Sequence, residues 1–176
     1  MPFTTLARPT AEEHAPYYGR YIALVKSADA VEALITQIDD TSSLLERVDE
    51  QRAASRYAPG KWSVKQVVGH LVDAERVFAY RAMRFARADQ TELPGFEEND
   101  YAKHGGFDGR PLTDLVLEFR AVRAASITLF ASFAPEVTLR RGTANDNPMS
   151  VRAVAWTIAG HELHHRALLV ERYGLK

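Results

Sequence analysis

The sequence predicts an all-α protein, a four-helix bundle with a long loop between the second and third helices. Four segments carry apolar residues at helical spacing. Breaks rich in proline and glycine separate these segments, and none shows the alternation of a half-buried strand. In a chain of 176 residues, four such helices are expected to form one domain spanning residues 1–176.

The first long helix is expected over residues 31–48. Asp29 is its N-cap, and Glu32 follows three residues later. Its apolar residues share one face: Val31, Leu34, Ile38, Leu45 and Val48. The preceding segment, residues 17–25, is expected to be either a shorter helix or an extended arm.

The second helix has the clearest start in the sequence. Pro59 and Gly60 break the chain, and Ser63 with Gln66 then forms a capping box. In that motif the serine hydroxyl accepts from the backbone of the third helical residue, whose side chain reaches back to the serine. The helix is expected to continue to about Ala88.

The second half of the chain contains a long break and two more helices. Residues 89–110 are expected to form a loop, and a loop of this length inside a domain is usually a functional lid or arm. A third helix follows Pro111, with apolar residues at helical spacing as far as Phe133. After a break at residues 141–148, the fourth helix runs from about Val151 to Tyr173, between a Ser150 cap and Gly174.

Composition narrows the classes of partner and ligand. The 22 basic and 23 acidic residues leave a net charge of −1, so no basic excess exists to bind nucleic acid. Cysteine is absent, and a metal would need His, Asp or Glu ligands. Residues 1–6 lack the signal-peptide pattern, and no apolar run approaches the roughly 20 residues of a membrane span. We therefore expect a cytoplasmic protein without a membrane partner.

The fourth helix contains two histidines in its apolar stripe. This stripe comprises residues three or four positions apart: Val151, Val154, Ile158, His161, His165 and Leu168. His161 and His165 lie one turn apart and point the same way, so both imidazoles can reach one ion. Two hydrogen-bonded core histidines, or an exposed pair, are the alternatives. A metal would resolve the cost of burying both polar rings.

His70 adds a third candidate ligand. It shares an inward face of the second helix with Val67, Ala74 and Val77. Three protein ligands are usual for a metal site with an open position, so His70, His161 and His165 predict one divalent metal. Asp73 and Glu162 are candidates to accept from the ring N–H groups. His164 is rotated away from this face, and His104 in the long loop could approach the site.

Residues 161–165 also match the His-Glu-x-x-His signature of zinc metallopeptidases, in which the glutamate activates water. The third histidine that metzincins place at a fixed short distance is missing, and no strand is evident to align a peptide. A metallopeptidase is therefore the less favoured alternative.

Two motifs together resemble the DinB-like superfamily. The first comprises residues 60–71, from Gly60 to Leu71, and the second comprises residues 159–165. The similarity is closest to the branch of metal-dependent hydrolases and bacillithiol transferase-like proteins, and residues 93–101 also look like the loop of that branch. The resemblance covers about residues 9–173.

The resemblance implies a four-helix bundle with a long crossover, often a homodimer, and a metal on His70, His161 and His165. The metal is commonly nickel, zinc, iron or manganese, and members with known activities mostly use a low-molecular-weight thiol with a small-molecule substrate. We therefore expect a metal-dependent thiol transferase or a related hydrolase, with Glu162 as the candidate general base. A non-catalytic metal- or ligand-binding bundle is the alternative from another class.

Overall fold

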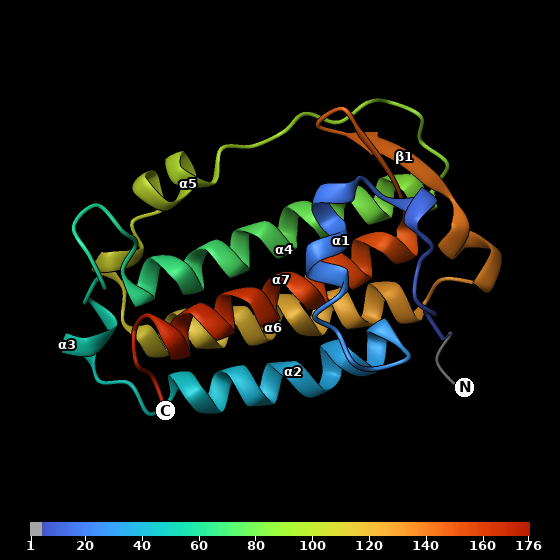
Figure 1. The fold of residues 1–176 in the computed structure, drawn as a ribbon. Coiled ribbons are helices and arrows are strands. Elements are labelled where there is room, and N and C mark those ends of the chain that lie inside the picture. Colours follow the sequence, from blue (N-terminus) through green and yellow to red (C-terminus); the bar gives the residue numbers. More distant parts are fainter. Residues whose placement is uncertain (1–4) are drawn as a thin grey trace.

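The computed structural model describes residues 5–176, and four long helices dominate it (Figure 1). Residues 1–4, on which the expectation about a signal peptide partly rests, lie outside the described residues. The long helices are α2 (Ala30–Leu45), α4 (Val64–Ala86), α6 (Leu112–Ala131) and α7 (Val151–Glu171). The predicted four-helix bundle is thereby confirmed.

The helices are connected in an order that requires a long crossover. Helix α4 packs against α6 and α7, and α2 packs against the same two helices from the opposite side. In Figure 1, α4 and α6 run in the same direction, whereas α2 and α7 run in the other. The chain between α4 and α6 must therefore return along the bundle, over a helix about 35 Å long. This return explains the long predicted loop.

The crossover is partly helical, which the sequence did not indicate. It contains α5 (Glu98–His104) and a 3₁₀ turn (Phe107–Gly109). Both are too short to give a clear periodic pattern, and tertiary contacts stabilise them. Phe107 packs against Gly69 of α4, where a Cβ atom would overlap the phenyl ring.

The expected absence of strands is wrong for the segment before α7. Strands β1 (Arg141–Ala144) and β2 (Asn147–Ser150) form an antiparallel hairpin. Its turn residues Asn145 and Asp146 have φ values of 51° and 60°, which Asn and Asp tolerate better than most residues. Strands of four residues are too short for alternation to be recognised.

The predicted helix starts are confirmed by their caps. Asp29 accepts from the Val31 amide, Ser150 accepts from the Ala153 amide, and the Ser63–Gln66 capping box is complete. The first long helix ends at Leu45 rather than Val48, and the second ends at Ala86. Residues 17–25, which were expected to form either a shorter helix or an extended arm, contain most of the short helix α1 (Pro16–Ile22). A single turn of helix also forms α3 (Glu50–Ala53).

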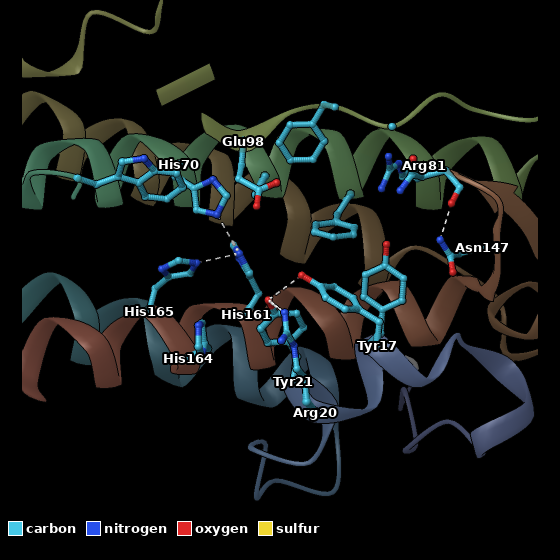
Figure 2. A pocket seen from close by; sticks show the side chains of 17 residues that line it. Tyr17, Arg20, Tyr21, His70, Arg81, Glu98, Asn147, His161, His164 and His165 are labelled. Atoms are coloured by element: carbon cyan, nitrogen blue, oxygen red, sulfur yellow. Dashed lines mark hydrogen bonds between the residues drawn. The ribbon is translucent and has the colours of Figure 1, made fainter. Parts of the chain in front are cut away.

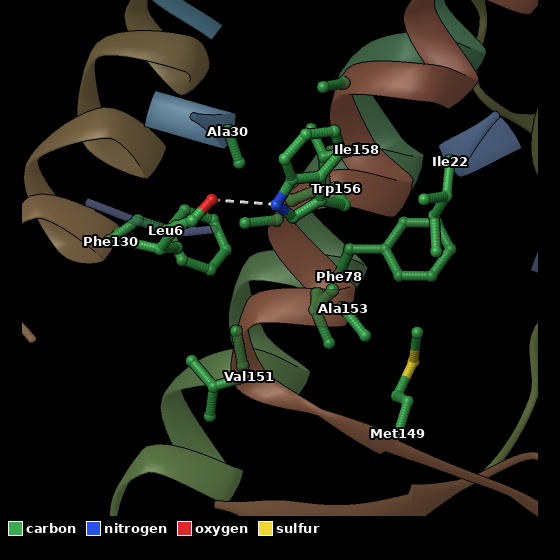
Figure 3. Close-up of a cluster of buried hydrophobic side chains, with 14 of the residues drawn as sticks. Leu6, Ile22, Ala30, Phe78, Phe130, Met149, Val151, Ala153, Trp156 and Ile158 are labelled. Carbon is green, nitrogen blue, oxygen red and sulfur yellow. Dashed lines mark hydrogen bonds between the residues drawn. The ribbon is translucent and has the colours of Figure 1, made fainter. Parts of the chain in front are cut away.

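The apolar core comprises two large clusters near the two ends of the bundle and a small one formed by Ile38, Leu71, Val72 and Phe119. One cluster surrounds the fully buried Trp156 of α7, whose Nε1 donates to the Leu6 carbonyl at 2.9 Å (Figure 3). A second cluster packs around Leu115 and Leu169 near the start of α4. Buried histidine, glutamate and arginine side chains of α4, α6 and α7 also lie inside the bundle.

None of the helices within residues 5–176 combines the length and the apolarity needed to cross a membrane.

Candidate metal centre and cavity

The three predicted histidines meet on the facing surfaces of α4 and α7. His70 comes from α4, and His161 and His165 come from successive turns of α7 (Figure 2). The Nε2 atom of His161 lies 3.1 Å from the Nε2 atoms of both His70 and His165. All three rings are nearly buried, with 6–9% of each residue exposed. The structure therefore brings the three predicted residues together, with their ligand atoms within 4.8 Å of one another.

This arrangement fits a bound divalent metal. Two nitrogens that bind one tetrahedral zinc ion are about 3.3 Å apart, given Zn–N distances of 2.0–2.1 Å. Without an ion, the Nε2 atom of a neutral His161 ring can form one hydrogen bond, as donor or as acceptor, although two imidazole nitrogens lie within hydrogen-bond distance of it. The donor set is thus better satisfied by a cation than by hydrogen bonds between the rings.

The protonation state also suits a metal. Burial is the largest cause of the lowered pKa of each histidine, and the neighbouring imidazoles add to it. The pKa of His70 falls to about 4, with His164 contributing. Burial likewise brings the pKa values of His161 and His165 well below their ordinary range. All three rings are therefore neutral at pH 7, the form that coordinates a metal.

Aromatic side chains enclose the three histidines. The ring of Trp62, just before α4, lies 4.8 Å from the ring of His70 and stacks on His165 at 6.4 Å. Tyr21 of α1 contacts His161 edge-on, with ring centroids 5.5 Å apart. Helix α1 can approach α7 this closely because residue 160 is glycine, and a Cβ there would overlap the Tyr21 backbone.

The three histidines form part of the wall of a cavity of about 570 Å³. Helices α1, α4, α5 and α7, the segment before α5 and the hairpin turn all contribute side chains to it (Figure 2). Its charged lining residues are Arg20, Arg81 and Glu98. This volume is typical of a small-molecule site.

Glu162 lies elsewhere, although it precedes the candidate ligand His165 by only three residues. It is 1% exposed, and its Oε2 accepts from Arg123 of α6 at 2.6 Å. Arg123 also makes a bidentate ion pair with Glu75 of α4. Among the described residues that line the large cavity, Glu162 is not present. Its position turns the carboxylate away from the space that a substrate could enter.

The other predicted polar residues have different positions. His104 is exposed on α5, where its Nδ1 contacts the Asp100 carbonyl, and it is not among the described residues lining the cavity. His164 is outside the group of three, as expected, but lines the cavity and contacts Tyr21 edge-on. Asp73 faces Arg76 rather than an imidazole.

Several cavity residues were missed from the sequence. Arg81 could have been found, because it lies eleven residues after His70 and so continues the inward face of α4. Glu98 and the asparagines of the hairpin turn could not, because their positions depend on how the crossover and the hairpin fold over the bundle.

A helical bundle with three buried, neutral histidines at the wall of a cavity belongs to the class of helical proteins whose interior can hold a divalent metal. Comparison with known proteins identifies the family. The model of the DinB superfamily matches residues 33–169, and the chain belongs to this superfamily. No curated protein matches the chain.

One solved structure similar to this chain is YfiT from Bacillus subtilis, a probable metal-dependent hydrolase with an unusual four-helix bundle topology. The match has a TM-score of 0.72 at 15% sequence identity, and it covers 97% of this chain and 95% of YfiT. At this identity the similarity establishes the shared fold.

Proposed function

We propose that this protein binds one divalent transition metal on His70, His161 and His165. In our proposal it transfers a low-molecular-weight thiol to a small-molecule substrate, and hydrolysis at the same site is the alternative. The observation that carries the proposal is that three Nε2 atoms converge on the wall of a cavity. The Nε2 atom of His161 lies 3.1 Å from that of His70 and 3.1 Å from that of His165. Zinc, nickel, iron and manganese are the candidate metals.

The choice of a thiol follows from the charge of the ligand set. Three neutral imidazoles leave the full positive charge of the ion in place, which favours an anionic partner such as a thiolate. When bound, a divalent ion lowers the pKa of a thiol or a water molecule and so supplies a nucleophile at neutral pH. The chain itself has no cysteine to compete.

Glu98 is the residue we propose as proton acceptor, in place of Glu162. It lines the same cavity as the histidines, and its carboxylate points toward the space beside His70 and His161 (Figure 2). A carboxylate in this position can take the proton that the thiol or water loses. Trp62, Phe78 and Tyr21 surround the site with aromatic surface, which limits the access of bulk water.

A metallopeptidase is disfavoured by the position of Glu162. That mechanism requires the glutamate of His-Glu-x-x-His to face the bound water, whereas here it forms a buried ion pair with Arg123. A non-catalytic bundle would bind the same metal and ligand but would not convert a substrate, so a measurement of turnover distinguishes it from our proposal.

The homodimer and the cytoplasmic location also stay predictions. Sedimentation velocity would test whether the protein is a homodimer.

The metal part of the proposal is tested by elemental analysis of protein purified without added metal. We expect one transition metal per chain, its loss in His161→Ala and His165→Ala, and at least an equally severe weakening in His70→Ala. His14→Ala is the matched control and should retain the metal. Full metal content in His70→Ala would mean that another residue is the third ligand.

The thiol part needs a spectroscopic test. In protein substituted with cobalt or nickel, glutathione, cysteine, coenzyme A or bacillithiol should produce a sulfur-to-metal charge-transfer band in the near ultraviolet. Thiol-dependent consumption of chlorodinitrobenzene should then fall strongly in Glu98→Gln while its metal content is unchanged. A site that responds to hydroxide but to no thiol, and cleaves nitrophenyl acetate, would favour the hydrolase.

A further inference from the structure

Arg81 is a buried cation that has no anionic partner among residues 5–176. It is only 3% exposed, and its guanidinium lines the cavity. One of its nitrogens donates to the Pro94 carbonyl at 3.0 Å, and its guanidinium carbon lies 5.5 Å from the centre of the Phe78 ring. Within residues 5–176, no carboxylate lies within ion-pair distance of it.

The second deeply buried arginine shows how unusual this is. Arg123 is 1% exposed and is balanced by Glu75 and Glu162. A buried charge without a counter-ion is costly, and burial accordingly lowers the pKa of Arg81. Since the described residues provide no counter-ion for Arg81, a molecule that enters the cavity is the remaining source of one.

The surroundings of Arg81 form a small polar site. The hairpin turn places Asn145 and Asn147 on the cavity wall, and Figure 2 shows Asn147 at the same end of the cavity as Arg81. Tyr18 also lines the cavity and packs edge-on against Phe78. A guanidinium flanked by amide and phenol groups can bind a planar carboxylate through several hydrogen bonds.

The position of Arg81 sets the shape of the ligand. Eleven residues of helix separate His70 from Arg81, which corresponds to three turns on one face and a rise of about 16 Å. Ala74 and Phe78 of α4 line the cavity between them. A molecule that touches both ends must therefore be elongated and have an apolar middle.

We propose that Arg81 binds a carboxylate of the substrate, at the end of the cavity opposite to the three histidines. The inference rests on the proposed function for the end of the substrate that reacts at the three histidines. For the end of the substrate that carries the carboxylate, it rests on Arg81 alone. A single guanidinium matches the single charge of a carboxylate better than the double charge of a phosphate monoester. The substrate class is thus an elongated small molecule with a terminal carboxylate.

The test compares straight-chain carboxylates with the alcohols of the same length. Binding of octanoate and decanoate, and of octanol and decanol, is measured by isothermal titration calorimetry with the metal-loaded protein. We expect the carboxylates to bind about ten- to hundredfold more tightly than the alcohols. This preference should disappear in Arg81→Met and be partly retained in Arg81→Lys.

Two controls separate binding from folding. Arg87→Met removes an exposed arginine of the turn that ends α4 and should keep the preference. Because Arg81 is an unbalanced buried charge, Arg81→Met should melt no lower than the wild type, whereas a purely structural arginine would be needed for stability. An unchanged carboxylate preference in Arg81→Met, or no preference in the wild type, would overturn the inference.

The result of this carboxylate-binding test can be distinguished from the results of the tests of the proposed function. The absorption spectrum of the cobalt-substituted protein shows whether decanoate coordinates the metal, and coordination with no dependence on Arg81 would contradict the inference. Conversely, a preference that depends on Arg81 in a protein that gives no thiol band and no turnover would support the inference and refute the proposed function.

Discussion

Arg123 of α6 connects its helix to the other three long helices through buried hydrogen bonds. It donates to Glu75 of α4, to Glu162 of α7 and to the Leu34 carbonyl of α2 at 3.2 Å. Replacing one partner of a buried ion pair leaves the other charge without compensation, and this typically costs about 3–5 kcal/mol. Both carboxylates depend on this one guanidinium for their charge balance.

We therefore expect Arg123→Met to lower the free energy of unfolding by about 3–5 kcal/mol, measured by urea denaturation. Arg120→Met on the same helix is the matched control. Arg120 pairs with Asp39 and Glu46 at the surface, where such pairs contribute about 0–1 kcal/mol. Equal losses in the two variants would contradict the importance of the buried cluster.

The contact between α1 and α7 depends on Gly160. Alanine normally stabilises a helix interior by about 0.5–1 kcal/mol relative to glycine. Here a Cβ would overlap the carbonyl group of Tyr21, and backbone cannot move aside as a flexible side chain can. Since Tyr17, Tyr18, Arg20 and Tyr21 of α1 all line the cavity, a displaced α1 would also change its shape.

Gly160→Ala should therefore destabilise the protein by about 1–3 kcal/mol, as overpacking does, and weaken ligand binding in the cavity. Thermal unfolding followed by circular dichroism measures the first effect. Gly109→Ala is the control, because a Cβ at residue 109 meets no atom within 4 Å. A Gly160→Ala variant that melts above the wild type would show that α1 is not held in this position.

Glu13 attaches the N-terminal segment to the start of α7. Burial raises the pKa of its carboxyl, but hydrogen bonds from Arg152, Thr10 and Ser150 outweigh burial and lower the pKa from 4.5 to about 2. The Nε atom of Arg152 lies 2.8 Å from Glu13 Oε2, and Ser150 Oγ lies 2.7 Å from the same atom. The ionised form is therefore the one that stabilises the fold.

A carboxyl with a lowered pKa contributes its full stability above the unfolded value near 4.5 and loses it as the pH falls through about 2. Glu13→Gln should accordingly lower the free energy of unfolding by up to about 3 kcal/mol at pH 7. The difference from the wild type should shrink between pH 4.5 and 2 in urea titrations. Glu136→Gln, at an exposed position, should show no such pH-dependent difference.

The bundle should fold without the proposed metal. Its two large apolar clusters, around Trp156 and around Leu115, pack the long helices together without any contribution from the three histidines. Chelation removes a ligand of the native state and should lower the melting temperature by roughly 5–10 °C. Circular dichroism should still show a helical protein that unfolds cooperatively.

An unfolded chain after chelation would instead mean that the metal is structural. Readdition of zinc or nickel provides the control, because it should restore the original melting temperature.

Local patterns in the sequence determined the four long helices, their caps and the three histidines. Helical spacing places His161 and His165 on one face of α7 whatever surrounds the helix, and a capping box specifies the start of α4 within a few residues. The position of His70 opposite these two histidines could be predicted because α4 and α7 each carry one apolar stripe, which faces the interior of the bundle. The ends of α2 and α4 were less certain, since helix termination depends on weaker local signals.

The tertiary structure decided which polar residues reach the cavity. Glu162 and His165 lie three residues apart, yet Arg123 holds Glu162 in a buried ion pair, and no spacing rule reveals a partner on another helix. Helical spacing places Arg81 on the inward face of α4, but that face borders a cavity, and Glu98 reaches it, only because the crossover and the hairpin cover the bundle there. Sequence periodicity specifies the face of a helix on which a side chain lies, whereas contacts distant in sequence determine what that face meets.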